Sequence, residues 1–203
     1  MKKTYLNEFH ANNGGQMVDF AGWEMPVNYG SQISEHKEVR ENVGIFDVSH
    51  MAVFDFAGSR QVEFLQHLLP NDVNKILDST RALYSPLLND EGMILDDLIV
   101  YHLGDENFRI ISNCGTRDQN NAWFTKVALN FDVAVDFKEE ASIIALQGPK
   151  AKQCLDEMFD VDLDPFHIQT LDDVMIARTG YTGEVGFEII SNASRGLELW
   201  NHF

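Results

Sequence analysis

The sequence has little cysteine and little positive charge, and each shortage excludes some kinds of protein. Its two cysteines, Cys114 and Cys154, lie far apart and outside any C-x-x-C motif, so neither a disulfide framework nor a zinc knuckle is indicated. Lysine and arginine number 15 against 32 aspartates and glutamates, which leaves a net charge of −17. Such a surface repels phosphate backbones, so no nucleic-acid partner is expected. Reduced thiols and a cytoplasmic location are the simplest interpretation.

Long apolar runs and common ligand signatures are also missing. No apolar stretch approaches the roughly 20 residues that a membrane helix needs, so no membrane association is expected. The opening residues MKKTYLNEFHANN resemble neither a signal peptide nor a transit peptide. The seven histidines show no H-x-x-x-H spacing, and there is no Walker loop, so no metal or nucleotide site is predicted.

The residues that are present predict an α+β fold with mostly antiparallel sheets and packed helices. Strand-like segments are often neighbours along the chain, which favours hairpins over a doubly wound sheet. Pro86 marks its strand as an edge or a bulge. The pattern predicts strands over 51–58, 82–88, 93–103, 107–114, 132–137, 141–147, 172–180 and 185–191, and helices over 31–44, 59–70, 117–130, 149–159 and 194–203.

Several helix ends are also predicted from single residues. Ser31 or Ser34 is expected to cap the helix over 31–44, and Gly44 to close it. Pro149 is expected at the first position of its helix, after a cap at Gly148. The final helix is expected to bury one apolar side, and it stops at Phe203 without a cap, which predicts a chain cut within an element. That apolar side consists of Leu197, Trp200 and Phe203.

Two adjacent aspartates, Asp96 and Asp97, stand inside the apolar strand segment 92–101, GMILDDLIVY. Side chains alternate between the faces of a strand, so each carboxylate lies on an otherwise apolar face, where an unpaired charge is costly. One interpretation is a carboxylate held ready for a cationic or N–H-bearing substrate. The other is a carboxylate satisfied by backbone amides or by an ion pair with Arg81 or Arg109. The pattern leaves both open and does not distinguish the two aspartates.

The segment RTGYTGEVGFEI (178–189) carries glycines at spacings that do not match the G-x-G-x-x-G dinucleotide fingerprint. A tight glycine-rich hairpin is one explanation. The other is backbone that approaches a flat ligand closely, with Tyr181 stacking on the ligand and Glu188 accepting hydrogen bonds.

Aromatic residues and methionines gather in MVDFAGWEMPVNYG (17–30) and GIFDVSHM (44–51), where a packed core is the usual explanation. His50 lies beside Asp47 and Ser49, but this spacing is too local for a catalytic triad, and no nucleophile elbow is present.

Together with NDV, ALYS, GMILDDLIVY and ALQGP, these segments occur in an order that resembles the aminomethyltransferase (T-protein) family of the glycine cleavage system. The resemblance runs from about Leu6 to the end of this chain. It corresponds to the N-terminal portion of the family's proteins. It implies an enzyme of one-carbon metabolism and glycine catabolism. Such an enzyme transfers the aminomethyl carbon from the lipoyl arm of the H-protein to tetrahydrofolate and releases ammonia.

The resemblance also implies roles for particular residues. The family's key acid matches Asp97, which would orient the pterin amine and stabilise developing positive charge. Glu188 would hydrogen-bond the pterin ring. The other residues implied to contact folate are Met51, Tyr84, Asn113 and Tyr181.

The family's fold implies two domains in this chain. The first would be discontinuous, residues 1–50 plus 141–203, truncated at its C-terminus. The second would be an inserted ferredoxin-like α+β domain, residues 51–140, and folate would lie in a channel between the two. The sequence departs from the family at Met93, where a second glycine is usual. A C-terminal barrel and an arginine-containing segment are expected beyond these residues, so the fragment can be inactive alone.

Two rival functions are compatible with parts of the sequence. One is a related folate-dependent demethylase of a small methylated amine or sulfonium compound. The other is a non-catalytic folate-binding protein of the same fold, whose branch is expected to lack the DDLIV acid and to replace RTGYTGE with a cysteine-containing motif. Both features of this chain count against the second rival. An acidic interaction module would leave the aspartate pair unexplained, and the sequence indicates no oligomeric state.

Overall fold

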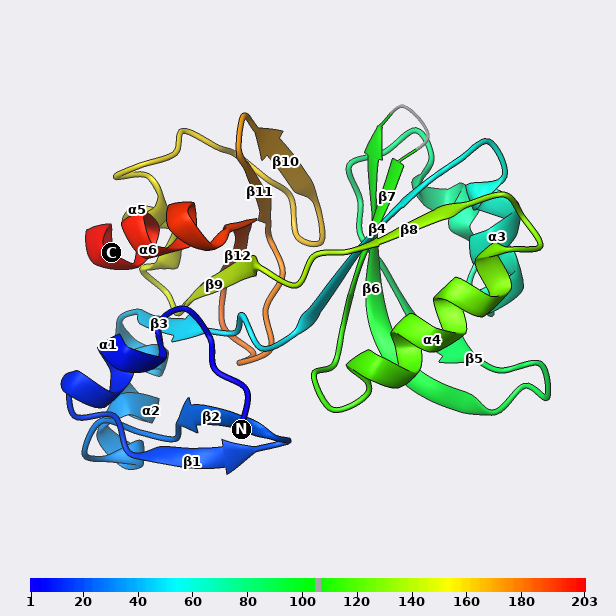
Figure 1. The fold of residues 1–203 in the computed structure, drawn as a ribbon. Helices are drawn as coiled ribbons and strands as arrows, with labels where there is room; N and C mark the ends of the chain where they lie inside the picture. Colours follow the sequence, from blue (N-terminus) through cyan, green and yellow to red (C-terminus); the bar gives the residue numbers. More distant parts are fainter. Residues whose placement is uncertain (105–106) are drawn as a thin grey trace. The chain divides into compact units, whose positions relative to one another are not determined.

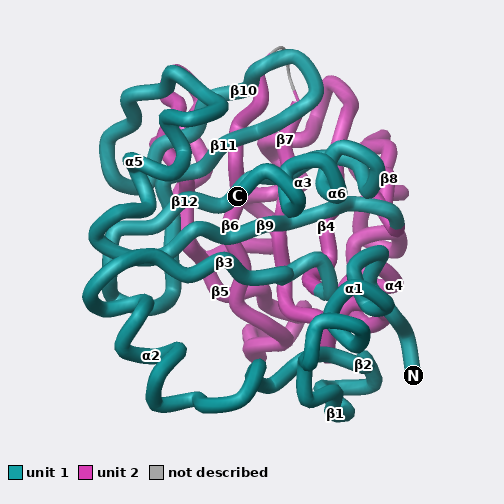
Figure 2. Tube along the Cα trace, turned by 90° about the vertical axis from the view of Figure 1, so that its left-hand side faces the viewer, with its two compact units in different colours: residues 1–50, 140–203 teal, residues 51–139 magenta. Residues whose placement is uncertain are grey.

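The computed structural model describes residues 1–104 and 107–203, and the chain divides into two compact units. Unit 1 comprises residues 1–50 and 140–203, and unit 2 comprises residues 51–139 (Figure 2). Each unit has its own five-stranded antiparallel sheet and its own apolar core. None of the helices in the described ranges is both long enough and apolar enough to cross a bilayer.

Unit 2 is built on a sheet with the strand order β5-β6-β7-β4-β8, and helices α3 and α4 pack on one face of it (Figure 1). Phe124 of α4 contacts Phe54 and Phe56 of β4 edge-on, with ring centroids 5.1 and 5.3 Å apart. Burying each such ring stabilises the unit by about 1.5–3 kcal/mol. The elements are β4 (Ala52–Ala57), α3 (Gln61–Leu68), the 3₁₀ helix η1 (Val73–Ile76), β5 (Leu83–Leu88), β6 (Ile94–Gly104), β7 (Asn107–Ser112), α4 (Arg117–Ala128) and β8 (Ala134–Phe137).

Unit 1 is built on a sheet with the order β10-β11-β12-β9-β3, and a separate hairpin joins β1 to β2. Strand β3 pairs with β9, so the opening residues share a sheet with residues nearly one hundred positions later. Helices α5 and α6 pack on this sheet through Leu155 and Leu199. The elements are α1 (Asn7–Asn12), β1 (Met17–Phe20), β2 (Trp23–Pro26), α2 (Gln32–Glu41), β3 (Gly44–Asp47), β9 (Ala141–Gln147), α5 (Ala151–Leu155), β10 (Ile168–Leu171), β11 (Val174–Ala177), β12 (Gly186–Asn192) and α6 (Ala193–His202).

The predicted α+β class with antiparallel sheets is confirmed, and so is the edge position of Pro86, which lies in the outer strand β5. The adjacent strands predicted over 93–103 and 107–114 pair as β6 and β7. Residues 105–106 between them lie outside the described residues. Ser31 caps α2, because its hydroxyl oxygen accepts a hydrogen bond from the amide of Ser34 at 3.3 Å.

Two predictions based on single glycines were wrong. Gly44 does not close α2, which ends at Glu41; it begins β3 instead. Glycine is needed there for close approach, because a Cβ at Gly44 would lie 2.7 Å from Cγ2 of Val39. Gly148 does not cap α5 either. A Cβ on it would lie 2.5 Å from the carbonyl oxygen of Asn42, and its φ is +135°.

The start of α5 and the buried side of α6 also differ from the predictions. Pro149 precedes α5, whose first residue is Ala151, because the chain still crosses the end of α2 at that point. In α6 the predicted residues Trp200 and Phe203 pack against the core, but Leu197 is exposed, and the fully buried residues are Gly196 and Leu199. The hairpin of β1 and β2 was not predicted. Its turn places Ala21 at a φ of 50°, a left-handed conformation that alanine seldom signals.

Candidate functional site

Asp97 lies on the face of the unit 2 sheet that α3 and α4 leave uncovered. Leu98 and Val100 of β6 point into the core of unit 2. Because side chains alternate between the two faces of a strand, the side chain of Asp97 points to the opposite face, where it is exposed. Strand β5 places Tyr84 diagonally across from it. The Tyr84 hydroxyl donates a 2.8 Å hydrogen bond to Oδ2 of Asp97. This hydrogen bond raises the pKa of Tyr84, so the hydroxyl keeps its proton at neutral pH.

Asn113 joins this group from the end of β7. Its side-chain Nδ2 donates to the backbone carbonyl of Asp97 at 3.2 Å and, at 3.4 Å, to Oδ1 of the same residue. Three of the residues predicted to contact folate, Tyr84, Asp97 and Asn113, therefore form one exposed polar group on unit 2. Met51 belongs to unit 2 as well. It is half-buried immediately before β4 and takes no part in these hydrogen bonds.

Asp96 points to the opposite side of β6 and is only 7% exposed. A bulge at Leu95 shifts the pairing between β5 and β6, so that Leu87 faces Asp96 and Leu88 faces Ile94. The carboxylate of Asp96 accepts hydrogen bonds from backbone amides and polar side chains near the start of α4. The explanation by backbone amides therefore holds for Asp96.

The alternative of an ion pair with Arg109 is not what the structure shows. Arg109 forms a bidentate pair with Asp55 across β4 and β7, at 2.7 and 2.8 Å. Asp97 keeps an exposed carboxylate with a neutral hydroxyl and an amide as its partners. Such a carboxylate can accept hydrogen bonds from a ligand and stabilise a positive charge on it.

In unit 1, Glu188 and Tyr181 lie on and before β12. Glu188 is buried, and burial raises the pKa of its carboxyl even though Thr179 donates a short hydrogen bond to it. Tyr181 is exposed on the preceding loop, and its ring meets that of Phe46 edge-on at 5.9 Å. The structure does not join Tyr181 and Glu188 by a hydrogen bond.

Gln147 explains the glycines of the segment RTGYTGEVGFEI. Its side chain is fully buried, and its Oε1 accepts a hydrogen bond from the Thr182 hydroxyl at 3.0 Å. A Cβ at Gly180 would lie 2.6 Å from Oε1, and a Cβ at Gly186 would lie 2.2 Å from Nε2. Two of the glycines therefore make room for this glutamine, which holds the loop that carries Tyr181.

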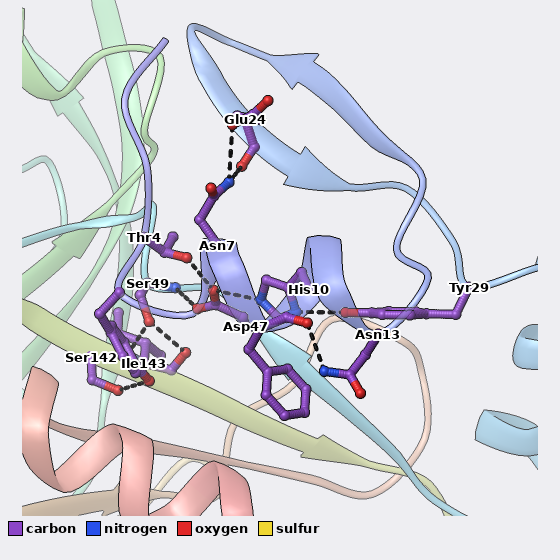
Figure 3. Close-up of polar contacts among 12 residues, drawn as sticks. Thr4, Asn7, His10, Asn13, Glu24, Tyr29, Asp47, Ser49, Ser142 and Ile143 are labelled. Atoms are coloured by element: carbon purple, nitrogen blue, oxygen red, sulfur yellow. Dashed lines mark hydrogen bonds and ion pairs between the residues drawn. The ribbon is translucent and has the colours of Figure 1, made fainter.

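A buried polar network in unit 1 is the feature that the sequence did not reveal (Figure 3). Asp47 accepts from the Thr4 hydroxyl at 2.6 Å and from the Ser49 amide at 3.0 Å, and its Oδ2 lies 3.1 Å from Nε2 of His10. The other ring nitrogen of His10 lies 2.6 Å from the Tyr29 hydroxyl. Burial raises the pKa of Asp47, but the hydrogen bonds from His10, Ser49 and Thr4 outweigh burial and leave the pKa below its ordinary value.

The Tyr29 end of this network opens into a cavity of about 840 Å³ within unit 1. Phe20, Phe46 and Trp200 form part of its mainly apolar wall, and Tyr181 lies at its margin. His50 also lines the cavity, and its ring contacts that of Phe20, whereas the carboxylate of Asp47 is bound by His10. Isolated in sequence, His10 carries no signal that it would be the partner of Asp47.

Comparisons with known proteins identify the family of this chain. The family model of the GCVT N-terminal domain matches residues 6–203. An aminomethyltransferase of Francisella tularensis subsp. tularensis is 47% identical over 208 residues, which cover 99% of this chain. A second, from Francisella philomiragia, is 44% identical over 209 residues. The chain spans 58% of the length of each of these relatives.

Solved structures show the same fold. Glycine cleavage system aminomethyltransferase T from Bartonella henselae superposes with a TM-score of 0.93 at 35% identity, covering 99% of this chain and 56% of that one. A chain of the heterotetrameric sarcosine oxidase from Corynebacterium sp. U-96 has a TM-score of 0.59 at 14% identity, covering 84% of this chain and 87% of that one, which shows likeness of fold alone. The fold and the motif-bearing loops thus define a protein of the T-protein class. The chain belongs to the GCVT N-terminal domain family.

Proposed function

We propose that this chain serves the aminomethyltransferase reaction of the glycine cleavage system. In that reaction the aminomethyl carbon passes from the lipoyl arm of the H-protein to tetrahydrofolate, and ammonia is released. The observation that carries the proposal is the exposed carboxylate of Asp97, held by Tyr84 on the helix-free face of a sheet. This carboxylate lies in a chain that is 47% identical to an aminomethyltransferase.

Asp97 is proposed as the catalytic residue. Its carboxylate accepts an N–H of the reduced pterin and stabilises the positive charge that develops as the aminomethyl carbon is transferred. Tyr84 donates to Oδ2 and so restricts rotation of the carboxylate, which leaves Oδ1 more weakly engaged and available to the substrate. Asn113 lies beside it as a further binding group.

Three further residues are proposed to contact folate. Glu188 hydrogen-bonds the pterin ring, and burial raises the pKa of its carboxyl. Tyr181 and Met51 provide apolar surface for the ligand. Tetrahydrofolate is a co-substrate in this scheme, and the acceptor groups of Asp97, Asn113 and Tyr84 suit its N–H groups.

The first test is a calorimetric titration of the chain with tetrahydrofolate. Replacing Asp97 by Asn is expected to weaken binding by about tenfold or more, because hydrogen bonds to a charged group contribute about 1.5–3 kcal/mol. Asp78→Asn, which removes another exposed carboxylate of unit 2, is the matched control and should leave binding unchanged. Equal affinities for the wild-type chain and the Asp97→Asn variant would refute the role of Asp97.

The second test addresses the donor. H-protein carrying the aminomethyl group on its lipoyl arm is mixed with tetrahydrofolate and the chain, and 5,10-methylenetetrahydrofolate is measured. The related demethylase is tested in parallel with small methylated amines in place of the H-protein. Product only from the methylated amines would replace the proposed reaction by demethylation.

A further inference from the structure

The two adjacent aspartates have different partners, and the difference has a chemical consequence for the exposed group. Asp96 is buried and fully engaged, whereas Asp97 is exposed. We propose that Asp96 is a positioning residue: it sets the direction of the hydrogen bonds so that Tyr84, Asp97 and Asn113 all present acceptors to the ligand. The geometric part of this inference is independent of the proposed function. Only the identity of the ligand rests on the proposed function.

All the hydrogen bonds at Asp96 run toward the carboxylate. Oδ1 accepts from the amide of Asp97 at 2.9 Å and from Nδ2 of Asn113 at 2.8 Å. Oδ2 accepts from the amide of Asn113 at 3.3 Å, from the Thr116 hydroxyl at 2.6 Å and from Nδ2 of Asn120 at 2.6 Å. Thr116 is the N-cap of α4, so the positive end of that helix also favours the carboxylate. A buried carboxylate with this many donors is stable inside an apolar strand.

This arrangement fixes the orientation of the Asn113 amide. An ionised carboxylate only accepts, so the Asn113 side chain must turn its NH₂ group toward Asp96. One of its two hydrogens is directed to Oδ1 of Asp96, and the other to the carbonyl or the carboxylate of Asp97. The flipped orientation would place two oxygens against each other. The amide oxygen of Asn113 therefore faces away from Asp96 and, because Asn113 is exposed, is available as an acceptor.

The remaining two groups are acceptors for similar reasons. Tyr84 donates its one hydroxyl hydrogen to Asp97, so only the lone pairs of its oxygen are available to a ligand. The carboxylate of Asp97 accepts in any case. The exposed group thus selects a ligand edge that carries several N–H donors or a protonated amine, and it disfavours an edge of ring nitrogens without hydrogens. Reduced tetrahydrofolate carries hydrogens on ring nitrogens that lack them in oxidised folate.

The discriminating measurement is the ratio of the affinities for tetrahydrofolate and for oxidised folate, by calorimetry on the 203-residue chain. In Asp96→Asn, the new amide lets Asn113 flip and turn its NH₂ group outward. The ratio is expected to fall by about tenfold, the effect of one reversed hydrogen bond. A purely structural role would weaken both ligands equally and leave the ratio unchanged, and that result would overturn the proposal.

Thr116→Val is the matched control. It removes a hydrogen bond from the Oδ2 side of Asp96 and is expected to lower the thermal midpoint while keeping the ratio. Loss of the ratio in Thr116→Val would count against the proposal.

A second readout needs no ligand and keeps the inference testable if neither folate binds, a result that would count against the proposed function alone. The side-chain amide signals of Asn113 are identified in NMR spectra by their disappearance in Asn113→Asp. Their hydrogens are expected to exchange slowly with water in the wild-type chain, and at least tenfold faster in Asp96→Asn. Fast exchange in the wild-type chain would show that Asp96 does not hold the amide.

Discussion

The imidazole of His10 meets the carboxylate of Asp47 at 3.1 Å, although the two residues are 37 positions apart in the chain. Both side chains are only 1% exposed, and the Tyr29 hydroxyl lies on the other side of the ring (Figure 3). His10 belongs to α1 and Asp47 ends β3, so this contact ties the first helix to the edge of the unit 1 sheet. The contact makes the stability of unit 1 dependent on pH.

Asp47→Asn is expected to remove part of the acid dependence of folding. The folded pKa of Asp47 is depressed below its ordinary value of 3.8. Its stabilising contribution is therefore fully present above that value and is lost as the pH falls through the folded pKa. The variant should lose about 1–3 kcal/mol of unfolding free energy at neutral pH, because buried partners are left unsatisfied, and should then decline less steeply below about pH 4. Urea denaturation at several pH values measures the unfolding free energy at neutral pH and its decline in acid. If the unfolding free energy of the variant declined in parallel with that of the wild type, the prediction would be contradicted.

Glu188→Gln is expected to have the opposite dependence. Burial raises the pKa of this carboxyl above its ordinary 4.5, so the folded chain binds this proton more tightly than the unfolded chain does. The stability associated with that proton is lost as the pH rises through the folded pKa. The glutamine variant carries no charge and still offers an oxygen to Thr179, so it should equal or exceed the wild type in stability between about pH 7 and 8. Urea denaturation of both proteins at several pH values tests this. If the variant became progressively less stable than the wild type as the pH rises, the predicted pH dependence would be wrong.

Tyr84→Phe is expected to weaken tetrahydrofolate binding by roughly threefold to tenfold while changing stability by less than about 0.5 kcal/mol. The reason is that Tyr84 is 53% exposed, and its hydroxyl holds Asp97 and offers an acceptor to the ligand without supporting the core. Tyr5→Phe makes the matched comparison. The Tyr5 hydroxyl bonds to Ser142 at 2.6 Å inside unit 1, so its loss should lower stability without a direct effect on binding. If Tyr84→Phe lowered stability and Tyr5→Phe weakened tetrahydrofolate binding instead, these roles would be disproved.

Gly186→Ala is expected to destabilise the chain by about 1–3 kcal/mol, because the added Cβ would overlap the Gln147 amide. Gln147→Ala should lessen that penalty in the double variant, and a double-mutant cycle measures the coupling. Gly183→Ala serves as a control. Gly183 has a φ of +87°, and the nearest atom to an added Cβ is 3.5 Å away on Arg40, so its penalty comes from the backbone and should not respond to Gln147→Ala. Additive effects of Gly186→Ala and Gln147→Ala would contradict the proposed overlap.

Local patterns predicted local features and failed where another element intruded. The apolar run around Asp97 predicted strand β6, and the serine at position 31 predicted the cap of α2. Each of these features is formed by residues that are close together in the sequence, within one strand or one helical turn. The glycines at 44 and 148 were assigned to helix ends because glycine usually serves there. The structure shows that they make room for α2 instead, a contact that no local pattern carries.

The sequence by itself determined the α+β class, the order of most strands and helices and, through the order of its motifs, the family of this protein. It also showed that two carboxylates stand in one apolar strand, but alternation could not say which was exposed, and only the family resemblance selected Asp97. The tertiary structure decided that question, because α4 covers the side of β6 that carries Asp96 and leaves the other side open. It also decided that His10 is the partner of Asp47. Periodicity is written in neighbouring residues, whereas a hydrogen bond between distant residues exists only after the chain has folded.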